Sequence, residues 1–175
     1  MGASSLCMSS NDEHLQFLRI ALEEAEKCIP TPTAFCVGCV LVSRIGDDPI
    51  MMSTGFSREL AGNTHAEANA LAKFRSLPHN ELSKFSLTKS LSHADILASA
   101  DVYTTMEPCS VRTSGLAPCA DALIDARVKR CFIGVGEPDD FVKCEGAEKL
   151  TNAGIEVVWI KGLEEESLKV ARRGH

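Results

Sequence analysis

The chain has 175 residues, with 18 Lys and Arg against 24 Asp and Glu, and its formal net charge is -6. This acidity argues against an extended nucleic-acid surface, because binding a phosphate backbone requires clustered basic side chains. A single Trp and a single Tyr also leave little aromatic surface for stacking bases. The hydrophobic content of 45% is ordinary for a globular domain, so we expect a small-molecule partner and no nucleic acid.

Neither export nor membrane insertion is indicated. No apolar run approaches the about 18 residues of a membrane span, and no secretory segment follows Met1. We therefore expect a cytoplasmic protein, with no membrane partner, whose eight cysteines stay reduced. Residues 1–11 are Ser-rich and predict a flexible tail, and residues 12–175 predict a single domain without internal repeats. The sequence leaves open whether the protein is a homodimer.

The first half of the chain predicts a helix, a hairpin and a second helix. Apolar residues at helical spacing predict a helix over 12–28, capped by Asn11 or Asp12. Strands over 35–43 and 50–56 flank a Gly- and Asp-containing turn and form a hairpin. A helix follows over 65–77. The next stretch, 78–100, is polar and Ser-rich and predicts an insertion that is mostly loop, with one helical turn.

In the second half, strands alternate with helices. The expected elements are a strand over 101–106, a helix over 118–127, a strand over 130–135, a helix over 145–153, a strand over 155–160 and a helix over 163–171. Such alternation predicts a sheet with helices on both faces, and the opening hairpin makes the sheet mixed. The predicted fold class is an α/β, three-layer α/β/α sandwich around a mixed five-stranded sheet.

Four residues at two strand-to-helix junctions carry the chemistry. His65 and Glu67 form a His-x-Glu pair, and Cys109 follows Pro108 and precedes Cys119. One imidazole and two thiolates make a three-ligand site for Zn²⁺ that leaves the fourth position for water. A carboxylate beside that water serves as general base, so Glu67 is expected to be catalytic and not a ligand. This pattern is typical of the zinc deaminases, which hydrolyse an exocyclic ring amine.

The spacing of His65 and Glu67 constrains the local backbone. In a regular helix, residues two apart point away from each other, so His65 must lie at the non-helical edge for both side chains to converge. Asn63 and Thr64 are suited to that position. Helix N-termini at the two half-sites would also lower thiolate pKa values and stabilise negative charge near the metal.

Each of these features also has a purely structural explanation. Glu67 is compatible with a solvated helix end, and Cys109 and Cys119 are compatible with buried thiols, the usual fate of cysteine. A second cysteine pair, Cys36 and Cys39, has the C-x-x-C spacing of a redox protein. Residues three apart in a strand face opposite sides, which favours core packing for that pair. A redox function would require an exposed pair with a perturbed thiol pKa.

Nine residues separate Cys109 from Cys119, where zinc deaminases usually have C-x-x-C. The segments around these cysteines, Thr-Met-Glu-Pro-Cys-Ser at 105–110 and Ala-Pro-Cys-Ala-Asp-Ala-Leu-Ile at 117–124, resemble the deaminase domain of riboflavin biosynthesis, which has the same wide spacing. The resemblance covers residues 12–175 and continues through 134–139 and 162–165. Residues 55–67 are most similar to the fungal branch, and the resemblance implies a cytidine-deaminase-like fold.

The resemblance also implies a substrate. In the fungal-type pathway reduction comes first, so 2,5-diamino-6-ribitylamino-4(3H)-pyrimidinone 5′-phosphate would be converted to 5-amino-6-ribitylaminouracil 5′-phosphate and ammonia. Two departures from the bacterial pattern agree with this: Ala34 replaces an Asn that contacts the substrate sugar, and no reductase sequence follows before His175. The expected substrate contacts are Asn63 and, for the phosphate, Arg58, Arg112 and Lys143.

Two other functions remain. A nucleoside, nucleobase or tRNA-editing deaminase would share the zinc site, but the wide cysteine spacing and the acidity count against it. A non-catalytic zinc-binding partner subunit would share the fold, but such a subunit has no use for the carboxylate of Glu67 beside an open metal position.

Overall fold

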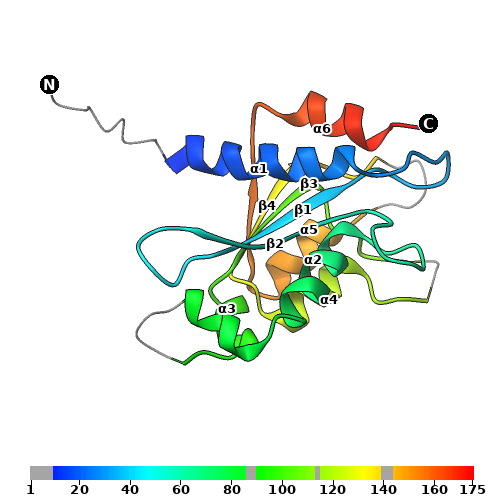
Figure 1. Ribbon diagram of the computed structural model, residues 1–175. Coiled ribbons are helices and arrows are strands. Elements are labelled where there is room, and N and C mark those ends of the chain that lie inside the picture. Colours follow the sequence, from blue (N-terminus) through cyan, green and yellow to red (C-terminus); the bar gives the residue numbers. More distant parts are fainter. Residues whose placement is uncertain (1–9, 86–89, 113–114, 139–143) are drawn as a thin grey trace, which may run out of the picture.

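The computed structural model describes residues 10–85, 90–112, 115–138 and 144–175. A five-stranded sheet of order β2-β1-β3-β4-β5 separates two layers of helices (Figure 1). The strands are β1 (Gly38–Ser43), β2 (Ile50–Phe56), β3 (Asp101–Met106), β4 (Arg130–Val135) and β5 (Glu156–Trp159). β1 pairs antiparallel with β2 and β3, whereas β3, β4 and β5 run parallel. The predicted mixed sheet of an α/β/α sandwich is confirmed.

Helices cover both faces of this sheet. The helices are α1 (Ser10–Glu26) and α6 (Glu164–Ala171) on one face, and α2 (Ala66–Arg75), α4 (Cys119–Ala126) and α5 (Gly146–Asn152) on the other (Figure 1). The apolar stripe of α1 packs on alternate residues of the central strands, with Leu18 and Leu22 against Val40 and Tyr103. The other cluster includes Phe74 of α2 and residues such as Val102 that face the opposite way. Strand alternation therefore supplies both cores.

Two glycines let helices approach the hairpin closely. A Cβ atom at Gly38 would lie 1.9 Å from the carbonyl oxygen of Ala21 in α1, and one at Gly55 would lie 2.3 Å from the carbonyl oxygen of Ala66. No larger residue fits either distance. Because Ala66 is the first residue of α2, the contact at Gly55 sets the start of that helix directly against β2.

The stretch 78–100 is more ordered than its composition indicates. It contains a 3₁₀ helix, η1 (His79–Phe85), and a short helix, α3 (His93–Leu97), and residues 86–89 lie outside the described residues. The prediction of a loop with one helical turn is wrong. Both helices contribute buried apolar side chains to the core, including Phe85 and Ile96. Each helix is too short to show a helical period in the sequence, and a capping box between Ser92 and Asp95 starts α3.

Most other predicted elements are confirmed with shifted ends. α1 already includes Ser10 and Asn11, so the predicted cap at Asn11 or Asp12 is wrong. Asp12 and Glu13 lie in its first turn, where their negative charges interact favourably with the free backbone N–H groups. The strand predicted over 35–43 begins only at Gly38. The N–H of Cys36 donates to the carbonyl of Ala171.

The described cysteines carry no disulfide, and Cys7 lies outside the described residues. Cys36 and Cys39 are both fully buried, which excludes the exposed pair that a redox function would require. Cys39 belongs to the core cluster with Leu41, and burial raises the pKa of its thiol. Cys36 precedes the strand and contacts the guanidinium of Arg58 instead. The packing interpretation of this pair is confirmed.

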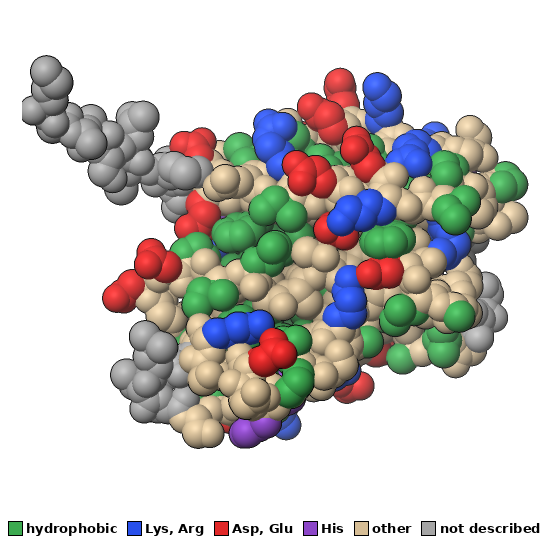
Figure 2. Space-filling view, in the orientation of Figure 1, with side chains coloured by type: hydrophobic (Ala, Val, Ile, Leu, Met, Phe, Trp, Pro, Cys, Tyr) green, Lys and Arg blue, Asp and Glu red, His purple; other side chains and the backbone are tan. Residues whose placement is uncertain are grey.

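The surface shown in Figure 2 mixes acidic and basic side chains, with apolar atoms between them. On this face the Lys and Arg side chains form no extended positively charged surface. Within the described ranges, no helix combines the length and apolar character needed to cross a bilayer.

Candidate active site

The predicted metal ligands converge beyond the carboxyl end of β3. His65 immediately precedes α2 and has an extended backbone (φ -98°, ψ 159°), so it lies at the non-helical edge, as its spacing from Glu67 requires. Cys109 follows β3 by three residues, and Cys119 opens α4. Nδ1 of His65 lies 3.5 Å from the Sγ atoms of both cysteines. Two helix N-termini and one strand end thus bring together three residues from three segments.

The distances between these donor atoms fit zinc. Tetrahedral bonds of about 2.3 Å to sulfur and about 2.0 Å to nitrogen place the imidazole nitrogen about 3.5 Å from each thiolate. The structure has this separation, and all three donor atoms lie within 4.8 Å of one another. In the part of the chain that the structure describes, His65, Cys109 and Cys119 are the one such cluster. The donor set and its geometry are therefore those of a three-ligand zinc site.

The environment favours a thiolate at Cys109. Its sulfur accepts the thiol proton of Cys119, lies beside the His65 ring and receives the backbone N–H of Cys119 at 3.3 Å, and these contacts lower the pKa of Cys109. The pKa of Cys119 is raised, first because its thiol donates that proton and then because it is buried. The N–H that reaches Cys109 belongs to the first turn of α4, whose free donors stabilise negative charge.

Glu67 lies in the first turn of α2 and is 3% exposed. Burial, followed by the nearby negative charge of Cys109, raises the pKa of its carboxyl group. Oε1 of Glu67 lies 3.1 Å from the hydroxyl of Thr104 on β3. A buried carboxyl group with a raised pKa, beside a metal-ligand cluster, is suited to accept a proton and return it.

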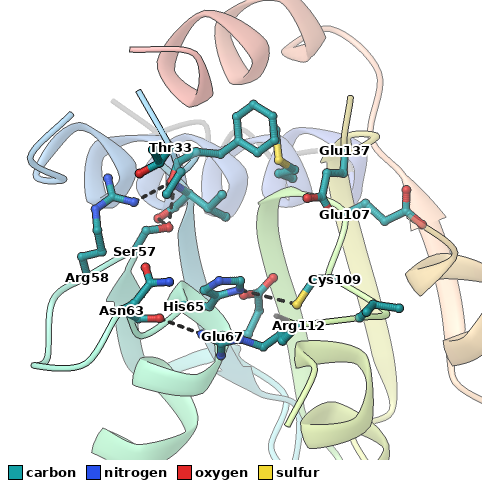
Figure 3. Close-up of a pocket in the computed structure, with 15 residues that line it drawn as sticks. Thr33, Ser57, Arg58, Asn63, His65, Glu67, Glu107, Cys109, Arg112 and Glu137 are labelled. Carbon is teal, nitrogen blue, oxygen red and sulfur yellow. Dashed lines mark hydrogen bonds between the residues drawn. The ribbon is translucent and has the colours of Figure 1, made fainter. Parts of the chain in front are cut away.

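A cavity of about 340 Å³ opens onto these groups (Figure 3). Its lining includes the expected Arg58, Asn63 and Arg112 together with His65 and Glu67. Lys143 lies outside the described residues. Two residues of the metal cluster, His65 and Cys109, therefore share one pocket with the buried carboxyl group and three of the four expected substrate contacts.

Arg58 and Arg112 also make contacts within the pocket wall. Nη1 of Arg58 donates to the carbonyl of Phe35 at 3.1 Å, and Nη2 donates to that of Ile29 at 2.8 Å. This guanidinium therefore holds the segment whose residues 33–35 line the cavity. Arg112 donates from Nη2 to the carbonyl of Asn63 at 2.7 Å. That bond joins the loop after Cys109 to the loop before His65.

Two acidic residues of the pocket were absent from the sequence-based site. Glu107 lies beside Cys109, and its Oε1 accepts the N–H of Ala147 at the start of α5. Glu137 follows β4, and burial raises the pKa of its carboxyl group to about 7. Oε2 of Glu137 is buried and has no hydrogen-bond partner among the described residues. Both residues occur in the sequence segments that carry the family resemblance, but only the order of the strands in the sheet brings Glu137 to the pocket.

Comparison with known proteins agrees with this geometry. Residues 11–135 match the family model for the cytidine and deoxycytidylate deaminase zinc-binding region. The chain is 40% identical, over 98% of its length, to the diaminohydroxyphosphoribosylamino-pyrimidine deaminase of Schizosaccharomyces pombe. It is 32% identical, over 84% of its length, to the riboflavin biosynthesis protein RibD of Chlamydia pneumoniae. The chain spans only 38% and 33% of these two relatives.

A solved structure extends the similarity to the fold. The Rib2 deaminase of Aspergillus oryzae superposes with a TM-score of 0.75 and 40% identity, over 93% of this chain and 92% of that one. The same Aspergillus protein has also been solved in complex with DARIPP. The chain therefore belongs to the cytidine and deoxycytidylate deaminase family, among the Rib2- and RibD-type deaminases of riboflavin biosynthesis.

Proposed function

We propose that this protein catalyses the zinc-dependent hydrolytic deamination of 2,5-diamino-6-ribitylamino-4(3H)-pyrimidinone 5′-phosphate to 5-amino-6-ribitylaminouracil 5′-phosphate and ammonia. The observation that carries the proposal is a cluster of three zinc donors, two of which line the same pocket as the buried carboxyl group of Glu67. Similarity to riboflavin-biosynthesis deaminases over most of the chain supports the choice of substrate.

His65, Cys109 and Cys119 would hold the Zn²⁺, which when bound supplies the Lewis acidity that activates water. Glu67 accepts the proton that the attacking water loses, passes it to a ring nitrogen and finally delivers a proton to the leaving amine. A carbon–oxygen bond forms and the exocyclic carbon–nitrogen bond breaks, so one water is consumed for each ammonia released. Burial of Glu67 excludes bulk water from this proton transfer.

The two sides of the pocket differ in charge and suggest how the substrate lies. Figure 3 shows Arg58 and Asn63 on one side and Glu107 and Glu137 on the other. Oε2 of Glu137, which has no hydrogen-bond partner among the described residues, is an acceptor suited to an amino group of the pyrimidine. Arg112, at the rim beside Asn63, is suited to the phosphate because arginine binds phosphate oxygens in charge-assisted pairs. The proposed substrate carries both kinds of group.

The experiment is an ammonia-release assay of the purified protein on five compounds: the ribityl 5′-phosphate, the ribosyl 5′-phosphate, cytosine, cytidine and deoxycytidylate. Ala34 lines the pocket, and the resemblance implies that the bacterial pattern has at this position an Asn that helps hold the substrate sugar, so we expect the ribityl compound to have the highest kcat/KM. A preference for cytosine or cytidine would overturn the riboflavin assignment and leave a deaminase. No ammonia from any compound, in protein with one zinc per chain, would favour a non-catalytic subunit.

The role of Arg112 is tested by the phosphate dependence of Arg112→Ala. We expect this variant to raise KM for the phosphorylated substrate and to leave the dephosphorylated analogue nearly unchanged, since only the former presents the anion. Arg112→Lys keeps the charge and serves as the matched control. An equal loss on both compounds would mean that Arg112 acts through its bond to the Asn63 carbonyl.

A further inference from the structure

Glu67 is held at one oxygen by a neighbouring strand. Its Oε1 lies 3.1 Å from Oγ1 of Thr104, the fourth residue of β3, and the hydroxyl group of Thr104 is fully buried. Glu67 itself belongs to α2, so this contact joins the helix that presents the carboxyl group to the central sheet. A side chain that must reach one reacting atom gains from such an anchor, because an unanchored carboxyl group samples several rotamers.

The same hydroxyl has a second partner. Oγ1 of Thr104 lies 2.9 Å from the carbonyl oxygen of Met106 on its own strand. The carbonyl oxygen of Met106 can only accept, so the Thr104 hydroxyl either donates its one proton to the Glu67 carboxylate or, when the carboxyl group is protonated at Oε1, accepts from it and donates to Met106. The contact with Glu67 therefore survives whether the carboxyl group carries a proton or not. Proton transfer by Glu67 passes through both forms.

Besides the two cysteines of the metal cluster, two further thiols lie near this pair. Cys39 of β1 and Cys131 of β4 flank β3, and both are fully buried. Burial is the main cause that raises the pKa values of both thiols, with the charge of Glu67 adding to it. They stay protonated and neutral around Thr104, so the Thr104 hydroxyl orients Glu67 from within an apolar, thiol-lined layer.

We propose that Thr104 is a positioning residue for the reaction: its hydroxyl fixes Oε1 of Glu67 and so directs the other carboxyl oxygen toward the metal cluster and the substrate. This inference rests on the proposed function, in which Glu67 moves the proton. Thr104 does not touch the substrate, since it is absent from the pocket lining. It acts through Glu67.

The next residue of β3 offers a matched control. Thr105 is also fully buried, but its side chain points to the opposite face of the sheet, where Oγ1 accepts the N–H of Gly38 at 3.2 Å. Thr104→Val and Thr105→Val each remove one buried hydroxyl from one strand and keep the side-chain shape. A loss of kcat caused only by altered packing would appear in both variants. A loss caused by misplacing Glu67 would appear in the first alone.

The first test measures kcat, KM, zinc content and Tm for these two variants and for Thr104→Ser. We expect Thr104→Val to lower kcat by about ten-fold or more, since small misplacements of a catalytic group are costly, with KM and zinc per chain unchanged. Thr104→Ser should restore most of kcat, and Thr105→Val should lower Tm and keep kcat. Equal losses of kcat in both valine variants, or no rescue by serine, would overturn the proposal.

A double-mutant cycle tests the route through Glu67. If Thr104 acts only by orienting Glu67, Thr104→Val should cause no further loss of kcat in a Glu67→Gln background. A full additive loss would overturn the proposal. Normal turnover by the Glu67→Gln variant alone would instead contradict the proposed function, in which Glu67 moves the proton. The cycle therefore distinguishes failure of the proposed function from failure of the inference about Thr104.

A substrate-free readout separates the proposal from the proposed function. The infrared band of the Glu67 carboxyl group, identified by its disappearance in Glu67→Gln, reports its hydrogen bonding directly. We expect this band to shift in Thr104→Val and to stay in place in Thr105→Val. An unshifted band in Thr104→Val would overturn the inference even in a protein without deaminase activity.

Discussion

Acidic groups lie in the protein interior at both ends of β3, but the partners of these groups differ between the two ends. At the start of the strand, Asp101 is 0% exposed and accepts hydrogen bonds from Arg130 at both oxygens and from Nε of Arg44 at 2.6 Å. Arg44 in turn binds Glu13 of α1 and the hydroxyl of Tyr103. Every charge in this group has a partner of opposite sign.

At the other end of the strand, the described part of the chain supplies no guanidinium partner for the acidic groups. Glu67 faces a hydroxyl and thiols, and one oxygen of Glu137 has no partner among the described residues. Burial raises the pKa values of both carboxyl groups. A buried ion pair is costly to break, whereas buried charges without a partner cost free energy and are concentrated at functional sites. The difference indicates that one end of β3 serves stability and the other serves chemistry.

The largest expected effect comes from removing a metal ligand at the chemical end of β3, which should lower activity and stability together. Cys119→Ala is expected to lose zinc, activity and thermal stability together, because the site joins β3, α2 and α4. Elemental analysis of the purified variant provides the measurement, with Cys131→Ala, a buried cysteine outside the cluster, as control. Full zinc content in Cys119→Ala would contradict the assignment of the second thiolate.

Glu67→Gln should affect activity without affecting the fold. The amide cannot take up a proton, so we expect a loss of turnover of roughly a hundred-fold or more with zinc content unchanged. The thermal midpoint should not fall, since the variant removes the cost of burying a charged carboxyl group. Near-normal ammonia release would remove Glu67 from the mechanism.

Asp101→Asn should show the opposite pattern. The substitution leaves Arg130 without its anion and Arg44 with Glu13 alone, and breaking such a buried pair costs about 3 kcal/mol. We expect denaturant titration to show this loss of unfolding free energy, while kcat of the folded protein stays unchanged. Asp47→Asn, at an exposed turn, is the control. A large fall in kcat with normal stability would mean that the two ends of the strand are not separate.

The smallest expected effect is a pH dependence at the paired end. Nδ1 of His14 on α1 lies 2.7 Å from the Tyr103 hydroxyl, and burial, followed by the charges of Arg44 and Arg130, lowers the pKa of His14 from 6.5. The unfolded chain therefore binds a proton first as the pH falls.

The contribution of His14 to the free energy of unfolding is fully present above the pKa of His14 in the unfolded chain, about 6.5. It decreases as the pH falls from there to the lower pKa of His14 in the folded protein. His14→Gln should flatten that part of the stability profile in denaturant titrations between pH 5 and pH 8. His79→Gln, at an exposed position, should leave the profile as it is. An unchanged slope in the His14 variant would contradict the lowered pKa.

Local patterns in the sequence determined much of this protein. His-x-Glu, the two cysteines and the strand-to-helix junctions around them predicted the ligands, and the spacing of His65 and Glu67 predicted the extended backbone that the structure has. Helical and strand periods predicted the mixed sheet, because each element is long enough to show its own period. These features are encoded within a few residues of one another.

Only the tertiary structure decided the rest, because it depends on residues far apart in the chain. Thr104 meets Glu67 across 37 positions, and nothing in either segment indicates the contact. The backbone N–H of Cys36 donates to the carbonyl of Ala171, more than a hundred residues later, and β1 begins only two residues after Cys36. Burial of η1 and α3, with too few residues to show a period, depends on the core they complete. Long-range packing sets these features, and short sequence windows do not contain it.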